Sequence, residues 1–328
     1  MILVTGGAGY IGSHIALALL DRGEQVAVLD DLSTGNRWLV PPEAMFVAAD
    51  CADAPRVTEL VRDNGITAVI HCAGVISVPE SVERPLHYYD INVGRAVALF
   101  AAAIAGGARH LLFSSTATVY GAVDAERLSE ELPMAPVNPY AASKAMVERV
   151  LADVAATGAA NVGVLRYFNV AGADPAGRSG QVSKTASHLI KIAAEAVVGK
   201  REHVAVTGSD FATADGTGVR DYIHITDLAA AHLATLDALV ADPAKSLTFN
   251  VGYGRGASVL EVLDAVDRVA GQSVKRIAAP RRPGDVARLV ADVTRIHAQL
   301  GWQPQHDDLD GIVADAIAWE QRLAAREG

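Results

Sequence analysis

The chain has few cysteines and no long uncharged apolar run. Its 2 cysteines, Cys51 and Cys72, are too few for a disulfide framework and are typical of a reducing cytoplasm. Residues 1–4 form only a short apolar run with no basic segment, so we expect no signal peptide. The most apolar stretch, residues 93–108, is interrupted by Arg95 and is too short to span a bilayer. These absences predict a cytoplasmic protein that has no membrane partner.

The chain also lacks an excess of basic residues. It carries 28 Lys and Arg against 38 Asp and Glu, a net charge of −10, which argues against a non-specific nucleic-acid partner. Its 10 histidines show no spacing typical of zinc, so we expect no metal site. Hydrophobic residues make up 51% and charged residues 20% of the chain, which is ample for a sizeable core and argues against long disorder. A length of 328 residues predicts about two domains.

In the first half, short apolar runs alternate with helical patterns. The runs cover residues 1–4, 25–29, 44–49, 68–71, 110–114 and 162–167. The helical patterns cover residues 11–21, 54–64, 85–105 and 140–156. This alternation predicts an α/β fold with a parallel sheet that helices cover on both faces. Ligands of such sheets bind at the carboxyl ends of the strands.

The second half is less regular. Residues 182–200 and 259–270 have helical patterns, and residues 221–239 have the pattern of a strand followed by a helix. We expect the boundary between the two halves near residue 170. The strand–helix pattern further on indicates that the halves interleave.

A glycine-rich segment, TGGAGYIG at residues 5–12, lies between the first predicted strand and the first predicted helix. Its Gly7-x-Gly9-x-x-Gly12 spacing permits a sharp turn, a close approach of a diphosphate to backbone N–H groups, and tight packing of the helix on the sheet. The helix N-terminus adds partial positive charge. Taken alone, the segment could be an ordinary glycine-rich turn.

Carboxylates follow the next two predicted strands. Asp30 and Asp31 end the second strand, where a carboxylate accepts hydrogen bonds from an adenosine ribose and repels a 2′-phosphate. Together with the glycines they predict a dinucleotide site that prefers NAD to NADP. Asp50 follows the third strand and is placed to meet the adenine, although its spacing fits a solvated surface acid equally well.

Tyr140 and Lys144 open a predicted helix and share one of its faces. A free tyrosine has a pKa of about 10, and lowering it to about 7 requires roughly 4 kcal/mol. A cation at about 4.5 Å supplies roughly that much at an effective dielectric constant of about 20. We therefore expect Lys144 to make Tyr140 a workable proton acceptor, with help from an oxidised nicotinamide. Ser114, Ser115 and Thr116 end an earlier strand, where a hydroxyl can bridge substrate and tyrosine.

Further motifs extend over nearly the whole chain. They are DDLSTG (30–35), HCAG (71–74), PESV (79–82), FSSTATVYG (113–121), NPYAASK (138–144), RYFNVAGAD (166–174), DGTGVRDYIH (215–224) and RRPGD (281–285). With the glycine loop, they resemble the extended short-chain dehydrogenase/reductase family and, within it, the UDP-glucose (UDP-galactose) 4-epimerases. The glycine loop and the Tyr–Lys pair identify only the superfamily, whereas RYFN, DGTGVRDYIH and RRPGD are more specific to the epimerases.

The resemblance implies a Rossmann-type doubly wound parallel sheet with a smaller α/β substrate-binding C-terminal domain. Residues 1–169, with 221–251 interleaved, would form the NAD-binding domain, and residues 170–328 the UDP-sugar-binding domain. It further implies NAD as cofactor, a UDP-sugar as substrate and a homodimer, which we expect to form through helices 85–105 and 140–156.

The resemblance also assigns roles to individual residues. The implied catalytic residues are Tyr140, Lys144 and Thr116. The implied cofactor-binding residues are Gly6, Gly9, Tyr10, Ile11, Gly12, Asp30, Asp31, Ser33, Gly35, Asp50, Cys51, Cys72, Ala73, Gly74, Asn92, Ser114, Tyr140, Lys144 and Tyr167. The implied substrate-binding residues are Thr116, Tyr140, Phe168, Asn169, His188, Leu189, Ala205, Thr207, Arg220, Tyr222, Arg282 and Asp285. Among them, Leu189 and residues 205–207 would line the uracil pocket, and Arg220 and Arg282 with Asp285 would hold diphosphate and ribose.

The chain departs from the family pattern at several positions. Ile76 stands where some members have a lysine that helps to bind the cofactor, and His188 replaces an asparagine. Thr207 stands where some members have an aromatic residue over the uracil, so that stacking is expected to be weaker. Leu289 occupies the position where bulk governs the acceptance of N-acetylated sugars, and its intermediate size leaves that specificity open.

The implied reaction is a 4-epimerisation. Tyr140, directly or through Thr116, would take the proton of the sugar 4′-OH while the C4 hydride passes to NAD, and the 4-keto sugar would turn and be reduced on its other face. Alternatives are a 4-epimerase of a UDP-N-acetylhexosamine or UDP-hexuronate, and a sugar-nucleotide dehydratase or decarboxylase. The dehydratase is disfavoured because Ala117 and Thr118, and no carboxylates, follow Thr116. A non-catalytic NAD sensor would not need the Tyr–Lys pair.

Overall fold

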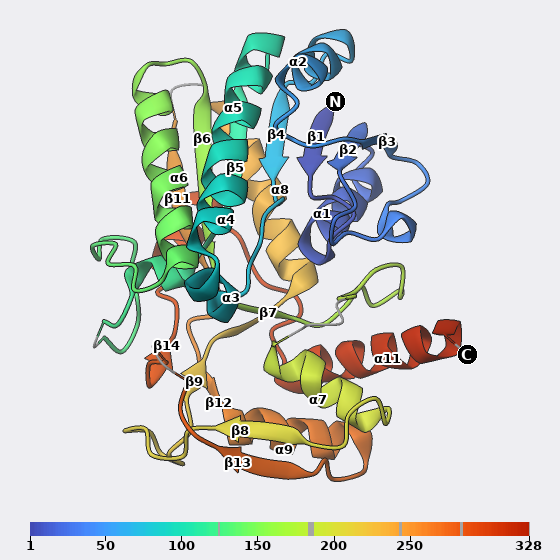
Figure 1. Ribbon diagram of the computed structural model, residues 1–328, viewed down its shortest axis with the longest axis vertical. Coiled ribbons are helices and arrows are strands. Elements are labelled where there is room, and N and C mark those ends of the chain that lie inside the picture. The colour runs from blue at the N-terminus through green and yellow to red at the C-terminus, as the bar shows by residue number, and fades with distance from the viewer. Residues whose placement is uncertain (124, 183–186, 243–244, 283–284, 328) are drawn as a thin grey trace.

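The computed structural model describes residues 1–123, 125–182, 187–242, 245–282 and 285–327. The chain forms a larger part around a parallel sheet and a smaller part beneath it, and the C-terminal helix lies between them in the view of Figure 1. No helix in the described ranges is long and apolar enough to cross a membrane.

The larger part is built on a 7-stranded parallel sheet. In spatial order its strands are β11 (Leu247–Val251), β6 (Asn161–Tyr167), β5 (His110–Thr116), β4 (Ala68–His71), β1 (Ile2–Thr5), β2 (Val26–Asp30) and β3 (Met45–Ala48). All residues of β1, β2, β4 and β6 are buried, which explains their nearly continuous apolar sequences. The strand order reverses between β1 and β4, the place where such sheets bind ligands.

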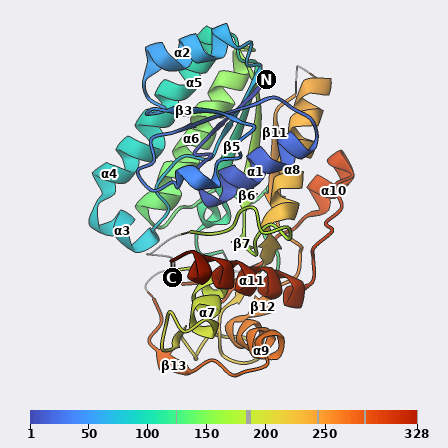
Figure 2. The same cartoon turned by 90° about the vertical axis from the view of Figure 1, so that its right-hand side faces the viewer.

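Helices cover both faces of the sheet (Figure 2). One face packs against α1 (Tyr10–Asp21) and α8 (Ile225–Ala241), and the other against α2 (Ala54–Asp63), α5 (Arg95–Gly106) and α6 (Pro139–Ala156). The helix predicted at residues 85–105 is divided into α4 (Pro85–Tyr89), a π-helical turn η2 (Asp90–Gly94) and α5. The remaining short elements here are η1 (Arg37–Leu39), α3 (Val78–Glu83), η3 (Ala117–Tyr120) and α10 (Thr294–Leu300).

Over the described residues, the smaller part contains two strand pairs, a three-stranded sheet, and helices α7, α9 and α11, which share a core. Its elements are β7 (Asn169–Ala171), α7 (Leu189–Val197), β8 (Val204–Thr207), β9 (Val219–Arg220), β10 (Tyr222–His224), β12 (Ala257–Ser258), α9 (Val259–Ala270), β13 (Arg276–Ala279), β14 (Arg288–Leu289) and α11 (Leu309–Glu327). The strand and helix predicted at residues 221–239 are present as β10 and α8, and β11 then joins the large sheet beside β6. The division into two domains near residue 170 stays a prediction.

The helix predicted at residues 182–200 is wrong at its start. Helix α7 begins at Leu189, and His188 is its N-cap with an extended backbone. Residues 183–186 lie outside the described residues. The apolar periodicity of α7 was correctly recognised, but the extended backbone of His188 sets the N-terminal end of the helix at Leu189.

A buried ion pair joins α6 to β6. The guanidinium of Arg166 donates from Nε to both carboxylate oxygens of Glu148 at 3.1 Å and from Nη2 to Oε2 at 2.7 Å. Its Nη1 donates to the Tyr120 hydroxyl at 2.9 Å, and Ser115 Oγ also donates to Glu148. Both side chains of the pair are almost completely buried, at 7% and 5% exposure. Their charges are therefore compensated mainly by each other and by these hydrogen bonds.

We predict that Arg166→Met lowers the free energy of unfolding by about 3–5 kcal/mol, because it leaves the Glu148 carboxylate buried without its partner. A matched control is Arg149→Met, which breaks the Arg149–Asp153 pair on helix α6. These two side chains are 77% and 66% exposed. The control should therefore lower the free energy of unfolding by less than about 1 kcal/mol. Urea unfolding measures both losses. Equal losses in the two variants would contradict this view of the buried pair.

Candidate functional site

The glycine segment turns from β1 into α1 at the point where the strand order reverses. Gly6 has a φ of +70°, and a Cβ on it would lie 2.6 Å from the backbone nitrogen of Ala73. A Cβ on Gly12 would lie 2.3 Å from the carbonyl oxygen of Gly6. The N-cap of α1 is Gly9, and no side chain caps this helix end. The backbone N–H groups of Tyr10 and Ile11 thus begin a helix whose positive end can face a diphosphate.

The two aspartates after β2 have different surroundings. Asp30 is 8% exposed, and its Oδ2 and Oδ1 accept hydrogen bonds from the backbone N–H groups of Ala8 at 3.0 Å and Leu32 at 2.8 Å. Asp31 is 39% exposed, and its Oδ1 accepts from the N–H and hydroxyl of Ser33. Asp30 therefore holds the loop, while Asp31 remains accessible to an adenosine ribose.

The loop after β2 folds back onto the glycine segment. A Cβ on Gly35 would lie 2.7 Å from Asp30 Oδ1, so that only glycine fits there. The next residue, Asn36, donates its backbone N–H to the carbonyl of Ala8 at 2.8 Å. Gly35 is thus part of the wall of the predicted cofactor groove.

Arg95 was missed as a site residue, because the sequence analysis treats it only as an interruption of an apolar stretch. Its Nη1 lies 2.6 Å from Asp50 Oδ2 and 3.8 Å from Asp31 Oδ2, and its Nε lies 3.9 Å from Asp90 Oδ2. The guanidinium therefore compensates the carboxylates after β2 and β3. Next to Asp50, burial raises the pKa of the Cys51 thiol to about 12, so Cys51 is neutral at pH 7.

The turn after β4 is fixed by Asn92 of η2. Asn92 Oδ1 accepts from the N–H of Val75 at 2.9 Å, and Nδ2 donates to the Val75 carbonyl and to Ser143 Oγ, both at 3.0 Å. Both Nδ2 hydrogens are thus used within the protein. Gly74 has a φ of +154°, and a Cβ there would lie 2.9 Å from Asn92 Oδ1. Asn92 therefore fixes the chain after Cys72, Ala73 and Gly74, which are predicted to bind the cofactor.

Lys144, Ser114, Tyr167 and Cys72 form one hydrogen-bonded group at the carboxyl ends of β4, β5 and β6. Lys144 Nζ donates to the Ser114 carbonyl at 3.0 Å. The Tyr167 hydroxyl donates to Ser114 Oγ at 2.7 Å, which in turn donates to Cys72 Sγ at 3.2 Å. Burial lowers the pKa of Lys144 to about 8, so the ammonium remains mostly charged at pH 7. The structure thus brings these predicted residues together.

Tyr140 lies on the same helix face as Lys144, as predicted. Burial raises the pKa of Tyr140 to about 12, and the hydrogen bond with the Thr116 side chain opposes this only in part. Lys144 Nζ is instead directed to the Ser114 carbonyl and lies 4.8 Å from the centre of the Phe113 ring. In the protein without cofactor, desolvation therefore keeps the pKa of Tyr140 high, and the predicted lowering by Lys144 together with an oxidised nicotinamide stays a prediction.

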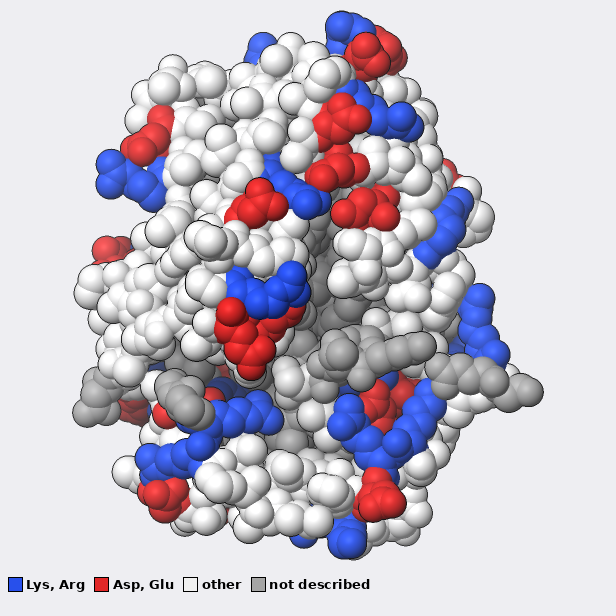
Figure 3. Space-filling model, viewed as in Figure 1, with Lys and Arg blue, Asp and Glu red and all other residues white. Residues whose placement is uncertain are grey.

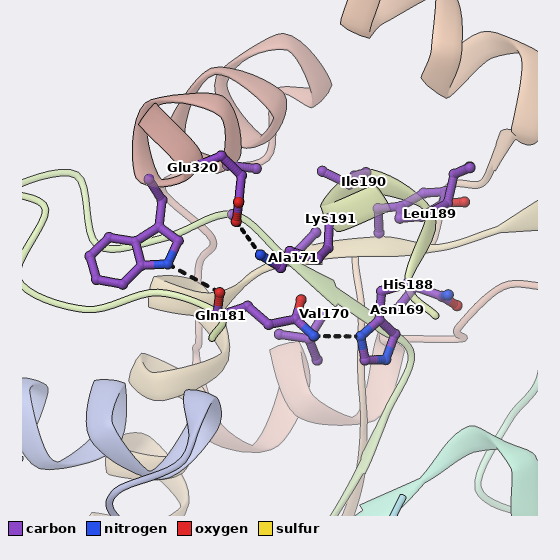
Figure 4. A pocket seen from close by; sticks show the side chains of 13 residues that line it. Asn169, Val170, Ala171, Gln181, His188, Leu189, Ile190, Lys191 and Glu320 are labelled. Carbon is purple, nitrogen blue, oxygen red and sulfur yellow. Dashed lines mark hydrogen bonds and ion pairs between the residues drawn. The ribbon is translucent and has the colours of Figure 1, made fainter. Parts of the chain in front are cut away.

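A cavity in the smaller part collects four of the predicted substrate-binding residues, Asn169, His188, Leu189 and Tyr222. Its other walls come from Gln181 and from α11, which contributes Trp319 and Glu320 (Figure 4). Burial lowers the pKa of His188. Gln181 and Trp319 are functional candidates that the sequence analysis missed, because no local pattern marks them.

A second group of predicted substrate residues surrounds Arg220. Arg220 Nη2 lies 3.8 Å from Asp285 Oδ1, and the charge of Arg282 also acts on Arg220. Phe168 is buried at 8% exposure. Pro283 and Gly284 of the RRPGD motif lie outside the described residues.

The space-filling view shows a hollow near the middle of the molecule with side chains of both charges around it (Figure 3).

Two predicted residues, Ala205 and Thr207, stand apart from the cavity. Both lie on β8, which pairs with β13, and neither lines the cavity around His188. Ala205 is exposed and Thr207 is partly buried.

Of the departures from the family pattern, Ile76 is 58% exposed, and Leu289 is partly buried on β14.

Comparisons with known proteins agree with this geometry. A model of the NAD dependent epimerase/dehydratase family matches residues 2–252. A UDP-glucose 4-epimerase of Azospirillum brasilense is 48% identical over 327 residues, which cover 100% of this chain and 94% of that protein. A UDP-glucose 4-epimerase of Bacillus subtilis is 40% identical, with 97% of this chain and 96% of that protein covered.

A solved structure is similar over the full length as well. The UDP-glucose 4-epimerase of Stenotrophomonas maltophila, crystallised with NAD and formylated UDP-arabinopyranose, superposes with a TM-score of 0.95 at 40% identity, covering 100% of this chain and 99% of that one. The family model, the full-length relatives and the shared fold lead to one conclusion: the chain belongs to the NAD dependent epimerase/dehydratase family.

Proposed function

We propose that the protein interconverts UDP-glucose and UDP-galactose by NAD-dependent 4-epimerisation. The observation that carries the proposal is the position of Tyr140, Thr116 and Lys144 at the same sheet edge as the glycine segment. Support comes from relatives named UDP-glucose 4-epimerase and from a Bifidobacterium longum UDP-glucose 4-epimerase solved with NAD+ and UDP, with a TM-score of 0.92 and 35% identity.

The residues at this edge fit NAD. A Cβ at Gly6, Gly7 or Gly12 would clash with neighbouring atoms, the end of α1 has no capping side chain, and Asp31 is accessible for a ribose hydroxyl. When bound, NAD+ supplies a hydride acceptor for the sugar C4 and returns the hydride to the other face of the sugar. The glycine segment, Asp31 and Lys144 would hold this cofactor, and the buried side chain of Tyr167 would help to exclude water.

Tyr140 moves the proton of the sugar 4′-OH. Bringing its pKa from about 12 to about 7 requires roughly 7 kcal/mol of stabilisation of the phenolate. The pKa of Tyr140 is raised although the Lys144 ammonium is already in place. The further stabilisation would therefore come from the cationic nicotinamide ring of bound NAD+ and from hydrogen bonds to the phenolate. Thr116 contributes the hydrogen bond that already favours the phenolate.

The nucleotide must stay fixed while the 4-keto sugar turns. Arg220 and Arg282 offer guanidinium groups for the diphosphate, and Asp285 can accept hydrogen bonds from the ribose. A dehydratase would need further acids and bases beside Thr116. In the segment after Thr116, Thr118 instead forms hydrogen bonds to the Thr116 hydroxyl, through its own hydroxyl at 3.0 Å and its backbone N–H at 3.2 Å. The absence of a carboxylate at Ala117 and Thr118 favours the epimerase.

A UDP-N-acetylhexosamine or a UDP-hexuronate is the second candidate substrate class, because Leu289 is of intermediate size. A panel of UDP-hexoses, UDP-hexuronates and UDP-N-acetylhexosamines, with the product configuration determined by NMR, tests the substrate. Conversion of UDP-glucose to UDP-galactose without added reductant is expected. Conversion of only the other two classes would replace the proposed substrate and keep the reaction.

We predict that Tyr140→Phe lowers kcat by about 10²–10⁴-fold, because it removes the general base. NAD should remain bound, since the glycine segment and Asp31 are unchanged. Turnover and the NAD content of the purified variant are the two measurements. Undiminished turnover would exclude Tyr140 as the base, whereas loss of NAD would show that the substitution acts on cofactor binding.

A pH titration tests the source of the acidity of Tyr140. In protein stripped of cofactor, burial keeps the pKa of Tyr140 near 12, so the phenol should stay protonated at neutral pH. In NAD+-loaded protein it should ionise below about pH 8. The difference in tyrosinate absorbance between wild type and Tyr140→Phe isolates this one phenol. The same titration in loaded and stripped protein would contradict a role for the cofactor charge.

We further propose that the protein is a cytoplasmic homodimer. Four large apolar side chains are exposed on neighbouring helices: Val82 at 62% on α3, Leu86 at 83% on α4, Val97 at 41% on α5 and Met146 at 47% on α6. Such a patch favours association with a second copy. The two free cysteines, Cys51 and Cys72, are compatible with a reducing compartment.

We expect Leu86→Glu to shift the protein from dimer to monomer in light scattering coupled to size exclusion, because it places a charge in the proposed interface. Val240→Glu is the matched control, since Val240 is 57% exposed on α8, which covers the opposite face of the sheet. A dimer that persists in Leu86→Glu, or that dissociates equally in both variants, would rule out this interface.

A further inference from the structure

Gln181 and His188 meet in the wall of the cavity in the smaller part. Nε2 of Gln181 lies 2.8 Å from Nδ1 of His188 (Figure 4). An amide nitrogen can only donate, so Nδ1 of the imidazole must accept. A neutral imidazole whose Nδ1 accepts carries its proton on Nε2. The side-chain amide of Gln181 therefore selects the Nε2–H tautomer of His188.

The protonation state of His188 agrees with this geometry. Burial lowers its pKa, so the ring is neutral at pH 7 and has a single N–H to direct. The charged groups that line the same cavity, Lys191 of α7 and Glu320 of α11, are paired with each other. Tyr222 of β10 also lines it, and burial raises the pKa of this phenol. The hydrogen bond from Gln181 is thus what orients the imidazole.

Gln181 is itself held from the opposite side. The indole Nε1 of Trp319 donates to the backbone carbonyl of Gln181 at 3.1 Å. A Cβ on the preceding Gly180 would lie 2.4 Å from Trp319 Cδ2, so the segment packs directly against the indole. Trp319 is 5% exposed and stacks on Trp38 with the ring centres 5.9 Å apart. The side chain that orients His188 thus starts from a fixed backbone.

His188 also has a suitable position for an anion. It is the N-cap of α7, a helix of 9 residues, and no side chain caps that helix end. The cavity that it lines includes Asn169, Leu189 and Tyr222, all predicted to contact the nucleotide sugar. A neutral N–H donor beside a helix N-terminus suits an oxygen that bears negative charge. In a UDP-sugar, that oxygen belongs to the diphosphate.

We propose that Gln181 is a positioning residue that fixes His188 as an Nε2–H donor to the diphosphate of the UDP-sugar. The proposal rests on the proposed function for the identity of the substrate. It assigns to Gln181 no contact with the substrate itself.

The experiment uses NAD-loaded protein in the Tyr140→Phe background, so that UDP-glucose binds without turnover. Gln181→Met removes the hydrogen bond at similar size, and it should weaken UDP-glucose binding about tenfold. In a His188→Leu background the same substitution should change nothing further, because Gln181 acts only through His188. Equal losses with and without His188 would mean that Gln181 acts through the fold alone.

The variant Gln181→Glu should make UDP-glucose affinity depend on pH, which a purely structural role of Gln181 would not do. A carboxylate at this position accepts from Nδ1–H, so Nε2 would keep its proton only while the imidazole is doubly protonated. Affinity for UDP-glucose should therefore fall as pH rises from 6 to 8 in this variant and stay flat in the parent. A flat profile in both proteins would overturn the proposal.

Long-range 1H–15N NMR of His188 reports the tautomer directly and needs neither substrate nor turnover. The parent should show a protonated Nε2 and an unprotonated Nδ1, and Gln181→Met should show a mixture. A protonated Nδ1 in the parent would overturn the proposal. If the parent shows the expected tautomer but does not bind UDP-glucose, the proposed substrate fails instead, so the two failures are distinguishable.

Discussion

Desolvation of the Tyr140 phenol is the constraint on which the proposed mechanism depends. The side chain as a whole is partly exposed, but desolvation raises the pKa of the phenol to about 12, so the protein without cofactor keeps the proposed base protonated at neutral pH. Lys144 remains mostly charged at neutral pH, but its Nζ bonds to the Ser114 carbonyl. In the mechanism that we propose, proton abstraction would require the positive charge of the oxidised cofactor, so that the base would be active only when that cofactor is bound. A tyrosine controlled in this way would not deprotonate groups in the empty site.

The surroundings of Tyr140 are fixed by side chains that do not react. Asn92 joins the turn after β4 to α6 through Ser143, and the buried Glu148–Arg166 pair joins α6 to β6. Helix α6 carries both Tyr140 and Lys144, so these contacts set the distance from the phenol to the cofactor groove. On the substrate side, Trp319 and Gln181 act in the same manner on His188. Precision in both halves of the site therefore comes from hydrogen bonds between elements that are distant in sequence.

Sequence reasoning identified those residues of the candidate site that short local motifs mark, and the structure brings them to the carboxyl edge of the sheet. The glycine turn, the acidic ends of β2 and β3, and the i, i+4 spacing of Tyr140 and Lys144 each follow from a few adjacent residues, and the alternating pattern predicted the parallel sheet. It missed Arg95, whose partner Asp50 is 45 residues away, and Gln181, which Trp319 holds from 138 residues away. It also took no account of the desolvation that raises the pKa of Tyr140 in the protein without cofactor, because desolvation depends on how distant segments pack around the phenol. The start of α7 was misplaced because apolar periodicity does not mark the extended N-cap at His188.

The most direct test of the central claim follows the hydrogen at C4. UDP-glucose carrying deuterium at C4 is incubated with NAD-loaded protein in ordinary water, and the product is analysed by NMR and mass spectrometry. If the hydride is taken and returned within one closed site, UDP-galactose should retain the deuterium at C4. Loss of the label to water, or epimerisation by protein stripped of its dinucleotide, would contradict the account.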